Sequence, residues 1–450
     1  MHWTHRGGTP YRRTVTRTPD SLLTRSAWDG HLRGSAEYRR VLAALFCAGV
    51  ATFAQLYSPQ AVLPQISGDL GVPASEAALV VSAATLGLAA GVIPWSMVSD
   101  RTGRVRAMSI AVIAATLFGL LVPFAPNPTL LLTGRVLEGL MIGGVPVIAI
   151  AYLTEEVASQ HVTRAAGTYV AGTTIGGLLG RVVAGPLADI TSWRIGVLAV
   201  AVLCAIAAIA FIVLTPPARG FTPPNASGVM DHGGIAARLT ANLRTPRQLA
   251  LYAVAFLLTG GFVALYNFLG FRLAAAPFHL PHTVISLVFV AYLAGTWASA
   301  RAGAVATRFG RKPVLLTSIA VMAFGTAATT STNVIVVLGG LVVATAGFFG
   351  AHAIASGWTA HAATVGKAQA SSLYNLSFYA GSSALGWMGG LVFDSSGWTG
   401  LAIVIITFAL IAAVLAATVL TRAPLRDRPL LESMKNQPLQ VVPVTPRRPR

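Results

Sequence analysis

The chain has 450 residues, of which 54% are hydrophobic and only 10% are charged. A soluble globular protein carries about 25% charged residues, because it needs them to cover its surface. This composition therefore excludes a soluble enzyme and predicts an integral membrane protein. The two cysteines, Cys47 and Cys204, both lie in apolar stretches, so we expect neither a disulfide framework nor a metal site.

Twelve stretches of the chain are long and apolar enough to be membrane spans, each of which takes roughly 17–25 residues. The expected spans are 41–63, 76–98, 107–125, 128–152, 166–188, 193–214, 248–270, 283–306, 313–332, 333–356, 369–393 and 397–421. The segment between the sixth and seventh spans is rich in Pro, Gly and Arg, which favours a linker. The predicted fold is thus all-α, with twelve transmembrane helices in two pseudo-symmetric six-helix bundles.

This pattern divides the chain into five parts. We expect a basic cytoplasmic tail (1–40), a first bundle (41–214), a cytoplasmic linker (215–247), a second bundle (248–421) and a disordered cytoplasmic tail (422–450). The first tail is similar in composition to a transit peptide, but a plain cytoplasmic tail is the simpler interpretation. The second tail is basic and rich in Pro, a composition typical of disorder.

The basic residues lie almost entirely on one side of the predicted membrane. Of the 32 Lys and Arg residues, 27 fall in the two tails and in the loops on their side, whereas only Arg194 and Arg272 fall in the opposite loops. The positive-inside rule then places both termini in the cytoplasm, and we expect a multi-pass protein of a bacterial inner membrane. Because membrane orientation accounts for the net charge of +18, we expect no nucleic-acid partner.

The two predicted bundles share a repeated loop. The segment Asp100–Arg106 follows the second expected span, and Thr307–Lys312 follows the eighth, at an offset of 207 residues. Two similar bundles in one membrane chain are typical of carriers, in which the substrate site lies between the repeats near the bilayer midplane.

The repeated loop resembles the signature motif of the major facilitator superfamily, and the resemblance covers about 41–421. Arg135, Glu138 and Gly139 are similar to that family's Arg-x-x-Gln-Gly motif. The glycines of the fifth span resemble its antiporter motif, except that Arg181 stands at the usual Pro. Gly347–His352 and Tyr374–Tyr379 resemble the YnfM-like, drug-efflux-type branch of inner-membrane exporters.

The resemblance implies a conformational latch, meaning a set of charges and turns that holds the two bundles together in one conformation. In the family, the carboxylate at the position of Asp100 faces the start of the eleventh span and is held by motif arginines. The residues that match the two motif copies are Asp100, Arg101, Gly103, Arg104, Arg308, Gly310 and Arg311. The alternative is a solvated loop that only sets the topology.

Three charged residues are expected at similar depth within adjacent spans: Arg135, Glu138 and Arg181. A charged side chain inside a membrane is costly, so it usually lines a cavity or finds a partner. We expect Glu138, held by the two arginines, to exchange a proton or to contact substrate. The alternative is a permanent ion pair that joins the fourth and fifth spans.

Other polar residues within spans are candidates for the substrate cavity. His352 has a side chain suited to proton handling, although a packing role would explain it as well. Gln55 and Tyr57 in the first span, with Tyr266 and Asn267 in the seventh, are further cavity candidates.

We therefore expect a secondary active transporter, not an enzyme, that moves a small organic solute outward by alternating access against inward proton flow. The alternatives are an importer by symport or uniport and, from another class, a membrane receptor or intramembrane enzyme. The expected partners are a small-molecule substrate, protons and the lipid bilayer, with the chain acting as a monomer. We expect no cofactor, because the chain contains no Walker loop and no His-Glu-x-x-His site.

Overall fold

The computed structural model describes residues 28–221 and 234–420, which form helices and no strand. The first bundle comprises α1 (Ala36–Tyr57), η1 (Ser58–Val62), α2 (Leu63–Leu70), α3 (Ala74–Thr102), α4 (Arg104–Leu121), η2 (Val122–Phe124), α5 (Pro128–Ile142), α6 (Pro146–Glu156), η3 (Ser159–His161), α7 (Val162–Ile190) and α8 (Trp193–Leu214). The second comprises α10 (Pro246–Ala274), α11 (His282–Leu287), η5 (Val288–Ala291), α12 (Tyr292–Phe309), α13 (Arg311–Ala328), α14 (Val334–Ala362) and α15 (Lys367–Val419), preceded by α9 (Ile235–Leu243).

The described residues cross a membrane twelve times, as predicted. Ten helical segments are long and apolar enough to span a bilayer. One of these, α15, has 53 residues and contains Gly397 in a non-helical conformation. A Cβ on Gly389 would lie 3.1 Å from the side chain of Leu401, so the chain folds back at Gly397 and α15 crosses twice. The remaining crossing is α13, whose first turn carries Arg311 and Lys312.

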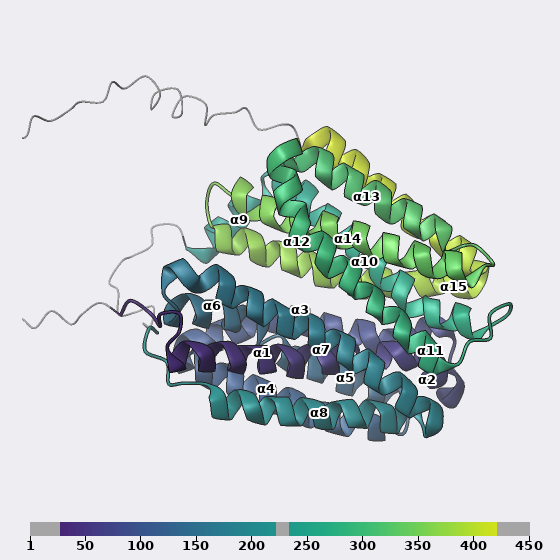
Figure 1. Ribbon diagram of the computed structural model, residues 1–450, viewed down its shortest axis with the longest axis horizontal. Coiled ribbons are helices and arrows are strands. Elements are labelled where there is room, and N and C mark those ends of the chain that lie inside the picture. Colours follow the sequence, from purple (N-terminus) through teal and green to yellow (C-terminus); the bar gives the residue numbers. More distant parts are fainter. Residues whose placement is uncertain (1–27, 222–233, 421–450) are drawn as a thin grey trace, which may run out of the picture.

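The two bundles lie side by side and diverge at one end (Figure 1). We call this the linker end, because α9, which belongs to the expected linker, lies there together with α6. We call the opposite end, where α2 and α11 lie, the far end. Hydrogen bonds at or toward the far end join the bundles: Gln60 to Asn267 (2.6 Å), Thr283 N to Asp189 (2.7 Å), Ser75 N to Asp394 (3.2 Å) and Thr85 to Ser383 (2.7 Å).

Glycines allow helices of the same bundle to pack closely. A Cβ added to Gly180 of α7 would lie 2.3 Å from the carbonyl oxygen of Ala54 in α1, and Gly172 and Gly176 face α1 in the same way. Because these three glycines are spaced four residues apart, they lie on one face of α7. Small residues at such a face let membrane helices approach each other, which fixes the position of Arg181, one residue further along α7.

Each motif loop at the linker end consists of a single glycine between two antiparallel helices. Gly103 has φ 91° and ψ 154°, and Gly310 has φ 90° and ψ 154°. Only glycine adopts this conformation without strain. The equality of the two turns supports the internal repeat inferred from the sequence.

Segments expected to be tail or linker contribute structure at the linker end. His31 N donates to the main-chain oxygen of Glu156 at 2.7 Å, and the amides of Arg219 and Gly220 donate to Glu156 Oε1 at 2.6 and 2.7 Å. The expected linker also contains a helix, α9. A segment rich in Pro and Gly can therefore still be helical in part. The tails at 1–27 and 421–450 lie outside the described residues.

Candidate functional site

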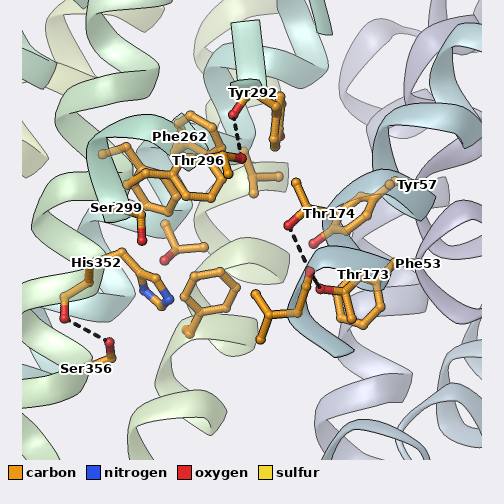
Figure 2. Close-up of a pocket in the computed structure, with 18 of the residues that line it drawn as sticks. Phe53, Tyr57, Thr173, Thr174, Phe262, Tyr292, Thr296, Ser299, His352 and Ser356 are labelled. Carbon is orange, nitrogen blue, oxygen red and sulfur yellow. Dashed lines mark hydrogen bonds between the residues drawn. The ribbon is translucent and has the colours of Figure 1, made fainter. Parts of the chain in front are cut away.

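A cavity of about 720 Å³ lies between the bundles. Figure 2 shows residues of α1 and α7 on one wall facing residues of α10, α12 and α14 on the other. The first bundle contributes Phe53, Tyr57, Thr173, Thr174 and Arg181. The second contributes an aromatic wall made of Phe262, Tyr292, Phe348, Phe349, Phe378 and Tyr379. A cavity of this size and apolar lining is typical of small-molecule sites.

The rings of the second bundle pack on one another and form a rigid surface. Phe262 stacks on Phe348 with ring centroids 3.9 Å apart and planes inclined by 8°. Tyr292 meets Phe262 edge-on at 5.6 Å. Aromatic pairs at such distances stabilise one another beyond the area they bury, so this wall presents fixed ring faces to a solute.

Arg181 is the one arginine among the residues that line the cavity, and its side chain is almost fully buried, at 2% exposure. Its Nε and Nη2 donate to Oε1 of Gln60 at 2.8 and 2.6 Å, and its Nη1 donates to the carbonyl of Gly177 at 2.7 Å. The guanidinium also lies 4.4 Å from the ring centroid of Tyr57 and 4.8 Å from that of Tyr292. These contacts hold the charge in one place.

The network around Arg181 extends into the second bundle. Gln60, which accepts from Arg181, donates from Nε2 to Asn267 Oδ1 at 2.6 Å. Asn267 was expected as a cavity residue, and the structure places it instead in the contact between the bundles. Gln60 was not expected to take part, although it follows Tyr57 by only three residues.

Glu138 and Arg135 form a buried ion pair inside the first bundle. Arg135 Nη1 donates to Glu138 Oε2 at 2.6 Å, and the two residues are 1% and 0% exposed. Arg135 also donates to the main-chain oxygens of Val80 (2.9 Å) and Leu56 (2.6 Å). Neither residue is among those that line the cavity.

Arg181 does not hold Glu138 in this conformation, contrary to the expectation from their similar depth. The ion pairs among the described residues include Arg135 with Glu138 but none that involves Arg181. The physical reason is direction: Arg181 points toward Gln60 and the aromatic rings, whereas Glu138 faces Arg135 on its own helix. The sequence gives the depth of a residue along its helix, but it does not determine the direction in which the side chain points.

Gln55 adjoins the ion pair. Arg135 Nη1 donates to the main-chain oxygen of Gln55 at 3.3 Å. The side-chain Nε2 of Gln55 donates to the carbonyl of Ala115 at 2.5 Å. Oε1 of Gln55 and Oε1 of Glu138 are both buried and have no hydrogen-bond partner among the described residues. An unpaired buried acceptor is costly, so this spot favours an additional donor.

His352 and Tyr57 line the cavity, whereas Tyr266 is not among the lining residues. Figure 2 shows His352 on the side of the second bundle, opposite Thr173 and Thr174. Its Nδ1 is 3.1 Å from the hydroxyl of Tyr374. Tyr266 instead shares a 2.7 Å hydrogen bond with Thr345 and is 1% exposed.

The first motif loop forms a charged cluster within its own bundle. Arg104 Nη1 lies 2.5 Å from Asp100 Oδ1, and Arg104 Nη2 lies 2.9 Å from Glu155 Oε1. Arg101, beside them, is exposed. Asp100 therefore has the expected partner Arg104, while the bundles diverge at this end (Figure 1).

The second motif loop makes different contacts. Arg308 lies over the ring of Phe309 at 5.2 Å, and Lys312 donates to the carbonyl of Ala417 at 2.6 Å. Arg311 lines a smaller hollow beside Trp358. The second copy has Thr307 where the first has Asp100, so it lacks the carboxylate around which the first cluster forms.

The aromatic wall was missed as a site, although the sequence contains a signal for it. Phe348, Phe349 and His352 belong to the segment Gly347–His352, and Asn375, Phe378 and Tyr379 to Tyr374–Tyr379, and all six line the cavity. Both segments were singled out only for their resemblance to the YnfM-like branch. The two segments, which lie far apart in the sequence, therefore meet at the cavity.

Comparisons with known proteins agree with this architecture. Residues 45–274 and 251–449 match the model of the Major Facilitator Superfamily. The chain is 36% identical to the inner membrane transport protein YnfM of Escherichia coli strain K12, over 87% of this chain and 92% of that protein. It is 33% identical to the uncharacterized MFS-type transporter YybF of Bacillus subtilis strain 168, over 87% of this chain and 96% of that protein.

A solved structure shares the fold. It is a bacterial homolog of the human lysosomal transporter Spinster, in an inward-facing and unoccupied conformation, with a TM-score of 0.68, 16% identity, and coverage of 86% of this chain and 96% of that chain. The relatives are named as transporters, which confirms the expectation of a transporter and not an enzyme. With the family model matched across both bundles, the chain belongs to the major facilitator superfamily.

Proposed function

We propose that the protein is a secondary active transporter that exports a small organic solute by alternating access, driven by protons that move inward. The observation that carries the proposal is the cavity of about 720 Å³ between two bundles that are joined toward the far end and diverge at the linker end. Rocking of the bundles about such a cavity exposes it to one side of the membrane at a time.

The distribution of basic residues supports an orientation in the membrane. With 27 of the 32 Lys and Arg residues on the side of the tails and linker, we propose that the linker end faces the cytoplasm of a bacterial cell and that both termini are cytoplasmic. In this conformation the cavity would open toward the cytoplasm, the side from which an exporter takes up its solute. The similar solved structure is described as inward-facing, which agrees with this orientation.

Glu138 is our candidate for the coupling group. It is a fully buried carboxylate that has one oxygen bound by Arg135 and the other, Oε1, without a partner among the described residues. A proton on Oε1 would supply a donor where Gln55 offers an unpaired acceptor. Because Glu138 lies behind the cavity wall and not on it, we propose a role in proton exchange and not in substrate contact.

Asp100 and Arg104 are our candidates for the latch. In the described conformation Asp100 pairs with Arg104, and Arg104 also pairs with Glu155, at the open linker end. Closure of that end would bring Asp100 toward the start of α15, and the second-copy residues Arg308, Gly310 and Arg311 occupy the equivalent loop. We propose that the chain carries out this cycle as a monomer.

The proposal is tested in proteoliposomes that contain the purified full-length chain in known orientation, with an imposed pH gradient and a panel of labelled solutes. We expect one class of solute to accumulate on the side from which protons leave, at a rate that falls when the gradient is collapsed. Accumulation on the side that protons enter would favour symport import. Movement that is independent of the gradient would contradict proton coupling.

A further inference from the structure

The charges around the cavity are unbalanced. Arg181 is 2% exposed and lines the cavity, yet none of the lining residues is Asp or Glu. The ion pairs within residues 28–221 and 234–420 do not include it. A buried cation without a carboxylate is costly, so something other than an acidic side chain stabilises this one.

Ring faces supply part of that stabilisation. The Arg181 guanidinium carbon lies 4.4 Å from the ring centroid of Tyr57 and 4.8 Å from those of Phe289 and Tyr292. A cation over ring faces is attracted by their quadrupoles. These contacts and the two hydrogen bonds to Gln60 fix the position of the guanidinium, but they do not neutralise its positive charge.

One donor of Arg181 remains free for a ligand. A guanidinium has five N–H groups, and four of them are accounted for by Gln60 (twice), Gly177 and the hydroxyl of Tyr292 at 3.4 Å. The fifth is on Nη1, which lies 3.3 Å from the position of a Cβ on Gly177, a residue of the cavity wall. Tyr57 points its hydroxyl into the cavity (Figure 2).

We propose that the cavity binds organic carboxylates with an apolar body, with the carboxylate on Arg181 and the body against Phe262, Phe348 and Phe378. The proposal rests on the proposed transport function and adds the charge class of the solute. A carboxylate supplies the missing counter-charge and accepts the free Nη1 donor in a charge-assisted hydrogen bond. A cationic solute would meet only repulsion from Arg181.

The test compares three ligands of one shape: 2-naphthoate, its neutral amide 2-naphthamide, and the cation 2-naphthylmethylamine. Binding to the purified full-length chain in detergent is measured by calorimetry, which needs no transport. We expect the carboxylate to bind at least about tenfold more tightly than the amide, or ~1.4 kcal/mol, and the amine most weakly. Equal affinities, a preference for the amine, or no binding of the carboxylate up to its solubility limit would overturn the proposal.

Variants then locate the charge. Arg181→Gln should remove the preference for the carboxylate over the amide, because the carboxylate loses more affinity than the amide does. Arg301→Gln is the matched control, because Arg301 also lies over a ring, that of Trp297 at 4.5 Å, but is not a cavity residue. Should Arg181→Gln fail to fold, Arg181→Lys keeps the charge while losing the fork geometry, and should retain a reduced carboxylate preference. An undiminished preference in either variant would overturn the assignment to Arg181.

The two proposals can fail separately. Carboxylate binding without any movement of the solute in proteoliposomes would contradict transport and leave the ligand class standing. Transport of amides and amines at the rate of the carboxylate would contradict the ligand class and leave transport standing.

Discussion

Arg181 donates two hydrogen bonds, from Nε and from Nη2, to a single atom, Oε1 of Gln60, at 2.8 and 2.6 Å. Gln60 in turn donates to Asn267 of the other bundle at 2.6 Å. The buried charge of the cavity is therefore connected through one side chain to the contacts that hold the bundles together toward the far end. A ligand that pulls on Arg181 would also change those contacts.

Replacing Gln60 should open the far end. Gln60→Leu removes the hydrogen bond to Asn267 that joins the bundles. A hydrogen bond between uncharged groups contributes about 0.5–1.5 kcal/mol, so the open population should rise about two- to tenfold. The readout is the rate at which an impermeant thiol reagent labels Cys introduced at Ser286, which is fully buried against Gly185, in a chain lacking Cys47 and Cys204.

The matched control for this experiment is Gln65→Leu. Gln65 lies on the following helix α2, and its Oε1 has no hydrogen-bond partner among the described residues. The control should label at the parent rate. A labelling rate for Gln60→Leu that matches the control would show that Gln60 does not hold the far end closed.

Neutralising Asp100 should impair transport without unfolding the protein. Asp100→Asn keeps the volume but removes the charge that pairs with Arg104 at 2.5 Å. If the latch interpretation holds, the transport rate falls because closure of the linker end loses a charged contact, while melting temperature changes little. Glu37→Gln, an exposed acid in the first turn of α1, should transport normally. Parent-like transport by Asp100→Asn would leave the loop with only a topological role.

Neutralising Glu138 should uncouple transport from protons. Glu138→Gln keeps an oxygen that Arg135 can donate to, and Arg135 retains the carbonyls of Val80 and Leu56. We therefore expect solute binding and downhill exchange to persist while accumulation driven by a pH gradient is lost. Flux, binding and melting temperature are compared per folded molecule.

Glu156→Gln is the control, since Glu156 is also 0% exposed but binds main-chain amides at the linker end. It should lower stability without uncoupling. A purely structural ion pair at Glu138 predicts the same behaviour for both variants: lower melting temperature, with gradient-driven flux reduced only in proportion to the folded protein.

The two motif glycines should respond alike to substitution. Gly103 and Gly310 share φ near 90° and ψ of 154°, so Ala at either position should cost about 1–3 kcal/mol through backbone strain. Thermal unfolding of the purified variants measures this effect. Gly68→Ala, at φ below zero with open space around it, should cost less. A tolerated Ala at only one of the two loops would contradict their equivalence.

The sequence predicts the helices and their order well, because membrane spans depend on length and apolarity alone. It also marks Gly103 and Gly310, since a one-residue turn admits little else. It does not predict which way a buried side chain points: Arg181 and Glu138 share a depth but face different partners. Nor does it predict the role of Gln60, because that role depends on how the two bundles meet.

The most direct test of alternating access is to measure distances at both ends of the full-length chain by pulsed electron paramagnetic resonance. Spin labels would be placed at Thr163 and Thr364 at the linker end, and at Ile190 and Ala276 at the far end, all exposed positions. On addition of a transported solute or a change of pH, we predict that the linker-end distance shortens while the far-end distance lengthens. Two distances that stay fixed while the labelled protein transports its solute would contradict the account.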